Sequence, residues 1–191
     1  MLEPLHHDKS FVTISTETKA LFESEESMPK VSCPYIPEGR IVQYVDGINP
    51  FMALAKEFAK EHSLDSVMPG AAVIIRNDTV LGIGANGSDY HKNNKCQRVI
   101  LGCKSGEGYE LCEGCHPRNH SEPSAIKDAL ARGNDTEGAD LYLWGHWWCC
   151  KPCWDAMIEA GINTVFLLVN SEVLFNKESP DNIVGKQFEL A

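Results

Sequence analysis

Two short stretches of the chain hold residues that together could bind a metal ion and move protons. The first reads NHSEP and sets His120 two positions before Glu122. The second reads WWCCKPCW and contains Cys150 and Cys153 in C-x-x-C spacing. One imidazole and two thiolates suit zinc, and three protein ligands leave the fourth tetrahedral position open for catalysis. We therefore expect His120, Cys150 and Cys153 to hold a catalytic zinc ion.

Glu122 is placed to act beside such an ion without being a ligand. A carboxylate there can take a proton from water and return it to a substrate nitrogen, so that one group serves as general base and general acid. Taken alone, an H-x-E triplet is more often the exposed start of a helix. A lone C-x-x-C pair is also typical of a redox centre or of half a structural zinc site. Their occurrence in this order, each at the start of a predicted helix, favours the catalytic interpretation.

The segments that would position these groups alternate between helical and strand patterns. Apolar residues recur at helical spacing after Asn49, and Pro50 suits a first helical turn. Residues 71–87 read as two strands joined by a turn at Asn77 and Asp78. Further along we expect helices at 120–133 and 153–161, strands at 141–145 and 163–170, and a long loop at 88–119. This alternation predicts a layered α/β domain.

The flanks and the composition set the context of that domain. We expect an N-terminal arm at 1–48, the domain at 49–170 and a weakly patterned tail at 171–191. The formal charge of -10 makes a nucleic-acid polymer an improbable partner and favours a small-molecule substrate. No apolar run approaches the ~18 residues of a membrane span, and no secretory signal begins the sequence, so a cytoplasmic location is expected. Eight cysteines in such a chain are better explained as metal ligands than as disulfides.

The ordered pair of motifs resembles the zinc-dependent cytidine and deoxycytidylate deaminase superfamily, and its deoxycytidylate (dCMP) deaminase branch in particular, over roughly residues 51–170. The resemblance implies a three-layer α/β/α fold with a mixed central sheet, and a homo-oligomer. It implies hydrolysis of a cytosine-type nucleotide or nucleoside, above all dCMP to dUMP, by zinc-bound hydroxide with Glu122 as proton shuttle. It also implies that Asn86, in the segment ANG, contacts the sugar and that His146 faces the base or the phosphate.

One position in the second motif differs from the family pattern, and several other functions stay open. The family usually has proline before the first cysteine, where this chain has Cys149, but only Cys150 forms a C-x-x-C pair with Cys153. Alternatives are a deaminase of another amino-heterocycle, such as a free base, guanine or a pterin-like ring, and a catalytically silent zinc-binding assembly subunit. Glu122 argues against the silent subunit, because a structural zinc site has no need of that carboxylate.

The loop at 88–119 offers ligands for a second metal ion. Its four cysteines, Cys96, Cys103, Cys112 and Cys115, are enough for a closed structural zinc site. The C-x-x-C spacing of Cys112 and Cys115 is regular, whereas Cys96 and Cys103 could instead be small buried apolar residues. Several deoxycytidylate deaminases carry an extra zinc in this loop, so the resemblance also implies the second ion.

Two further groups of residues have both a functional and a structural interpretation. The loop is locally basic and could hold a 5′-phosphate, or it could be an ordinary solvated face. The tryptophans near the second motif could stack on a base or pack in the core. The basic residues are Lys92, Lys95, Arg98 and Lys104, and the tryptophans are Trp144, Trp147 and Trp148.

Overall fold

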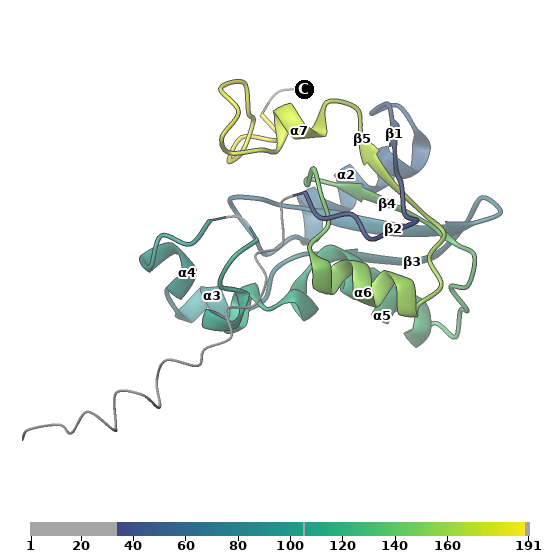
Figure 1. Ribbon diagram of the computed structural model, residues 1–191, viewed down its shortest axis with the longest axis horizontal. Helices are drawn as coiled ribbons and strands as arrows, with labels where there is room; N and C mark the ends of the chain where they lie inside the picture. The colour runs from purple at the N-terminus through teal and green to yellow at the C-terminus, as the bar shows by residue number, and fades with distance from the viewer. Residues whose placement is uncertain (1–33, 105, 190–191) are drawn as a thin grey trace, which may run out of the picture. The chain divides into compact units, whose positions relative to one another are not determined.

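A mixed five-stranded sheet forms the centre of the computed structural model, which describes residues 34–104 and 106–189 (Figure 1). The strand order is β1-β5-β4-β2-β3. β1, β5 and β4 run parallel, whereas β2 is antiparallel to both of its neighbours. The strands are β1 Val42–Val45, β2 Ala71–Arg76, β3 Thr79–Ala85, β4 Asp140–Trp144 and β5 Thr164–Leu168.

Helices cover both faces of this sheet, which explains why β2 is a continuous apolar run. Ala72 and Ile74 of β2 belong to the core on the side of α5 (Ser121–Ala131) and α6 (Lys151–Glu159). Val73 and its neighbours on the other face pack against α2 (Pro50–His62). Figure 1 shows α5 and α6 on one side of the sheet and α2 and α7 on the other. The predicted three-layer α/β/α fold with a mixed sheet is confirmed.

Local sequence signals determine where several elements begin and turn. The side-chain oxygen of Asn49 accepts hydrogen bonds from the backbone N–H groups of Phe51 (3.0 Å) and Met52 (3.2 Å), so it caps α2 as that residue type commonly does. The β2–β3 hairpin turns at Asn77 and Asp78, whose φ angles are 51° and 59°. Asparagine and aspartate tolerate this left-handed conformation better than other non-glycine residues. The predicted hairpin and first helix are therefore confirmed.

A glycine in β3 allows α5 to lie close to the sheet. A Cβ atom at Gly82 would lie 2.5 Å from the backbone oxygen of Ala125 and 2.6 Å from the Cβ of Ala129. Both distances are below van der Waals contact, so any side chain at this position would push α5 away. Since the site residues lie at the N-terminal end of α5, this close packing fixes their depth relative to the sheet.

The segment between β3 and α5 was predicted to be a loop, and it contains several short helical turns. Cys112 and Cys115 lie at the boundaries of two of these turns, so the segment has a defined path despite its lack of long elements. The turns are α3 Tyr90–Asn93, α4 Gln97–Ile100, η1 Tyr109–Leu111, η2 Glu113–Cys115 and η3 Pro117–Asn119.

Both flanks of the predicted domain contribute to its packing. β1, inside the predicted arm, is an edge strand of the sheet, and Val42 pairs with Val165 of β5. In the predicted tail, α7 (Ser171–Leu174) follows β5, and Phe175 and Phe188 pack on Trp144 with ring centroids 5.3 and 5.1 Å away. Most of the arm, residues 1–33, lies outside the described residues. Within the described ranges, no helix has the length and apolar character needed to cross a bilayer.

Candidate active site

The N-terminal ends of α5 and α6 bring the two sequence motifs together. His120 is the residue immediately before α5, and Cys150 is the residue immediately before α6. Cys153 lies in the first turn of α6 and is fully buried. β4 leads into the second motif and neighbours β2, against which α5 also packs, so the two helix starts converge on one side of the sheet.

The three side chains form a compact group of nitrogen and sulfur donors. The Sγ atoms of Cys150 and Cys153 are 3.1 Å apart, and Nδ1 of His120 lies 3.5 Å and 3.3 Å from them. Ligand atoms of a tetrahedral zinc ion with these donors are separated by about 3.5–3.8 Å. The group is therefore close to the size of a zinc site, and its donors are those that zinc prefers, so the residues fit the ion.

The protonation of the two thiols also suits a metal site. Contact with Cys153 lowers the pKa of Cys150 to about 6, and burial raises the pKa of Cys153 well above its usual value. Two buried sulfurs this close together cannot both be ionised without a nearby cation, and a bound divalent cation would hold both as thiolates.

Glu122 lies in the first turn of α5 and is only 4% exposed. Burial lowers the pKa of His120, but contact with Cys150 and then the nearby Glu122 raise it above its usual value. Burial first, and then Glu122, raise the pKa of Cys149. Burial also keeps the Cys149 thiol protonated at neutral pH. Cys149 is not part of the donor group, to which the C-x-x-C pair contributes Cys150 and Cys153.

Asn86 and His146 lie together at the end of β3, but Asn86 is already fully engaged with the protein. Its Oδ1 accepts hydrogen bonds from Ser63 Oγ (2.6 Å) and from the Gly70 N–H (2.9 Å), and its Nδ2 donates to the Met68 carbonyl (2.8 Å). The side chain thus ties β3 to the loop before β2. A role in sugar binding would require some of these bonds to be exchanged.

His146 stands 3.5 Å from this asparagine, measured from Nε2 to Nδ2 of Asn86. Burial lowers the pKa of His146 to about 4, so the imidazole is neutral at physiological pH. The ring packs on the backbone at Gly70, where a Cβ atom would lie 2.7 Å from Cδ2 of the imidazole. A neutral imidazole can accept or donate one hydrogen bond but offers no positive charge to a phosphate.

A second donor group, here called the loop group, consists of His91, Cys96, Cys112 and Cys115. The Sγ atoms of Cys96 and Cys115 are 3.5 Å apart, and Nε2 of His91 lies 3.1 Å from Cys112 Sγ and 3.9 Å from Cys115 Sγ. Burial raises the pKa of Cys112, but several hydrogen bonds, the strongest of them to His91, together outweigh burial and lower the pKa to about 6. Burial raises the pKa of Cys115 to about 12. Three sulfurs and one nitrogen match the number and kind of donors found in closed tetrahedral zinc sites.

The loop group differs from the predicted ligand set at one position. Cys103 was expected to be a ligand, but its place is taken by His91 of α3. The loop turns at Gly102 and Gly108, both with positive φ, and directs Cys103 toward Gly108 rather than toward the other sulfurs. His91 carries no spacing signal, because it approaches from a separate turn, so sequence reasoning missed it.

The other ambiguous residues are mostly used for structure. Trp144 is 3% exposed and packs in the core on the α2 side, which excludes it from stacking on a substrate at the α5 side. In the basic loop, Lys92 pairs with Asp89, and Arg98 donates to the backbone carbonyls of Lys104 and Glu107. At least these two cations are engaged within the loop itself.

Comparisons with known proteins agree with this geometry. The model of the family described as "cytidine and deoxycytidylate deaminase zinc-binding region" matches residues 46–169. Comparison with curated proteins gives no match.

Three solved structures are similar to part of the chain. A diaminohydroxyphosphoribosylaminopyrimidine deaminase/5-amino-6-(5-phosphoribosylamino)uracil reductase from Thermotoga maritima is 25% identical, with a TM-score of 0.37, and the match covers 61% of this chain but only 28% of that chain. The dCMP deaminase of cyanophage S-TIM5 is 17% identical, with a TM-score of 0.42, over 63% of this chain and 82% of that chain. The guanine deaminase of Bacillus subtilis is 20% identical, with a TM-score of 0.38, over 61% and 60%.

Proposed function

Because the chain belongs to the family of the cytidine and deoxycytidylate deaminase zinc-binding region, we propose that it hydrolyses the exocyclic amine of a cytosine-type nucleotide or nucleoside, with dCMP converted to dUMP as the main reaction. The observation that carries the proposal is the buried Glu122 beside the donor group of His120, Cys150 and Cys153. A metal site with a structural role alone has no need of a buried carboxylate next to its ligands, since burying a carboxylate is costly.

The residues of the chain supply ligands, proton transfer and a dry environment. Zinc, when bound by His120, Cys150 and Cys153, makes water nucleophilic at neutral pH. Glu122 would take one proton from the attacking water and give it to the ring nitrogen, then take the second proton from the new hydroxyl on the ring carbon and give it to the amine, which leaves as ammonia. Burial of Glu122 and of both cysteines keeps bulk water away from the transferred proton.

A panel of amino-heterocycles tests the substrate assignment. Ammonia release should be fastest with dCMP, slower with deoxycytidine and cytidine, and lowest with cytosine and guanine. The measurement is coupled-enzyme detection of ammonia at equal substrate concentrations. A clear preference for guanine or for a pterin-like ring would show that the substrate is another amino-heterocycle. Ammonia release from none of the compounds would support a catalytically silent zinc-binding subunit.

Assembly into a homo-oligomer stays a prediction.

We propose further that the loop group binds a second zinc ion with a structural role. Support comes from its four donors, which leave no position open for substrate, and from Gly114. A Cβ at Gly114 would come within 2.5 Å of the His91 ring, so the backbone there is shaped to accept the imidazole.

Metal analysis of the purified protein is expected to give about two zinc ions per chain. Cys112→Ser should remove one of them and lower the unfolding midpoint by about 10 °C, because a structural zinc contributes its binding free energy to folding. Cys103→Ser is the matched control, since this thiol lies in the same loop but outside the donor group, and it should keep both ions. One zinc per chain in the parent, with Cys112→Ser as stable as the parent, would contradict the second site.

A further inference from the structure

The loop that carries the second donor group also holds an aromatic ring against the catalytic histidine. The rings of Tyr109 and His120 meet edge to face, with centroids 4.9 Å apart and planes at 73°. This arrangement is favourable for aromatic pairs and restricts rotation of the imidazole. The Arg98 guanidinium carbon lies 4.3 Å from the centroid of the Tyr109 ring, so this ring contacts both a cation and the His120 imidazole.

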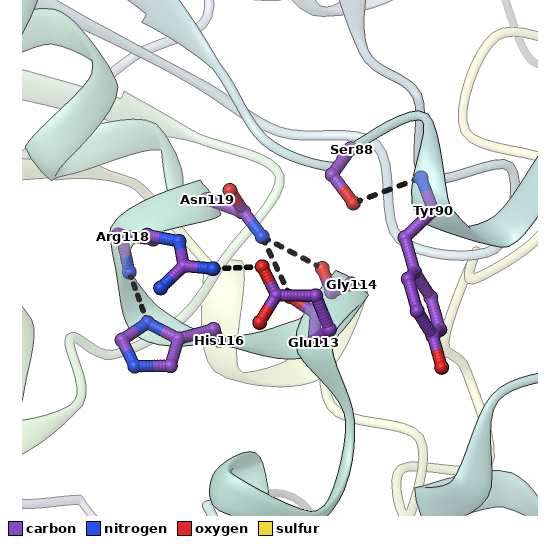
Figure 2. A network of polar contacts seen from close by, with 7 residues as sticks. All are labelled: Ser88, Tyr90, Glu113, Gly114, His116, Arg118 and Asn119. Atoms are coloured by element: carbon purple, nitrogen blue, oxygen red, sulfur yellow. Dashed lines mark hydrogen bonds and ion pairs between the residues drawn. The ribbon is translucent and has the colours of Figure 1, made fainter.

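A second set of contacts links the loop to the residue immediately before the catalytic histidine. The side-chain amide of Asn119 donates to the carbonyls of Glu113 (2.9 Å) and Gly114 (3.3 Å), as Figure 2 shows. The backbone carbonyl of Asn119 accepts from the N–H of Gly87, just beyond β3 (2.9 Å). Asn119 therefore connects η2 to the start of α5 and to the end of β3.

Both sets of contacts begin at ligands of the loop group. The N–H of Cys112 donates to the carbonyl of Tyr109 at 3.4 Å, and Cys115 ends η2, whose carbonyls hold Asn119. An ion pair between Arg118 and Glu113 closes the same turn (Figure 2). A metal ion bound by Cys112 and Cys115 would therefore hold in place the backbone next to Tyr109 and the carbonyls of η2 that bind Asn119.

We propose that the loop metal positions His120 for the catalytic zinc, with Tyr109 and Asn119 as the positioning residues that connect the two donor groups. The inference rests on the proposed function in one respect, namely that His120 is a ligand of the catalytic ion. The new element is that an ion bound at the loop group raises the zinc affinity of the group formed by His120, Cys150 and Cys153, in addition to stabilising the loop.

The test is the affinity of the catalytic zinc, measured by competition with a chromophoric chelator in the absence of substrate. The ion is identified as the one that Cys150→Ser lacks. Loss of a contact that orients a metal ligand typically weakens affinity ~10- to 100-fold. We expect such a loss in Tyr109→Leu, in Asn119→Ala and in Cys96→Ser, which removes the loop metal. Tyr109→Phe, which keeps the ring, and Leu111→Ala, which changes a neighbour in η1, should stay within about threefold of the parent.

Each outcome of this experiment supports or overturns the inference. If Cys96→Ser loses one zinc yet holds the catalytic ion as tightly as the parent, the two sites are independent and the proposal is overturned. Should Tyr109→Leu fail to fold by circular dichroism, Asn119→Ala decides the matter, because its amide makes only the loop contacts described above. If the unsubstituted protein contained no zinc, the proposed function itself would be refuted. If the protein bound zinc but released no ammonia, the affinity measurement would still test the link between the two donor groups, because it is made without substrate.

Discussion

Replacing Glu122 by glutamine is expected to abolish nearly all turnover while the zinc content and the fold stay as in the parent. Glutamine has almost the same shape and leaves His120, Cys150 and Cys153 unchanged, so the donor group should survive. The carboxylate that accepts the proton of water is lost. General acid and base groups typically contribute ~10²- to 10⁴-fold. Because Glu122 would serve several transfers, a loss of about 10⁴-fold in kcat is expected.

The control for this variant is Glu159→Gln, which makes the same change at an exposed position near the end of α6. It should retain full activity. Zinc analysis and circular dichroism establish that both variants are intact, and steady-state ammonia release gives the rates. A Glu122→Gln protein with a rate within tenfold of the parent would show that this residue is not the proton shuttle.

Cys153→Ser is expected to remove one zinc ion per chain and to reduce activity below detection. Serine is a weak zinc ligand at neutral pH because its hydroxyl stays protonated, and only His120 and Cys150 would remain. Zinc affinity and turnover should therefore fall together. Elemental analysis of the dialysed protein and the ammonia assay provide the two measurements.

Cys149→Ser serves as the neighbouring control in the same motif. This thiol is buried but lies outside the donor group, so its replacement should keep the zinc and cost at most a modest part of the rate. If Cys149→Ser lost the metal while Cys150→Ser kept it, the motif would be displaced by one residue from the assignment made here.

The donor group of His120, Cys150 and Cys153 was accessible to sequence reasoning because each of its residues lies in a short motif with a local signal. His120 and Glu122 share one helix start, and Cys150 and Cys153 share another, so each motif places its pair at the N-terminal end of a helix. The turn at Asn77 and the cap at Asn49 are local in the same sense, since the chemistry of single residues determines them. What the sequence left open was which elements lie next to one another in the sheet.

The residues that reasoning from sequence missed act through contacts distant along the chain. His91 joins the loop group from α3, where no repeated spacing marks it, while the nearer Cys103 is directed elsewhere by two left-handed glycines. Tyr109 reads as an ordinary loop residue until its ring is seen against His120. Such pairings depend on how the loop closes, and spacing along the sequence contains little information about closure.

The pairing of β1 with β5 has a consequence for how the sheet is completed. β1 precedes the family-matched stretch 46–169, yet it pairs with a strand close to the end of that stretch. The partners are among the most distant in the chain, which raises the contact order and delays the closing of this edge until β5 has formed. A fragment that starts at residue 46 would present β5 as an open edge, and unpaired parallel edges favour association between chains. The four residues of β1 cover β5, so the edge that remains open on this side of the sheet is a short strand, which is a poorer template for pairing with another chain.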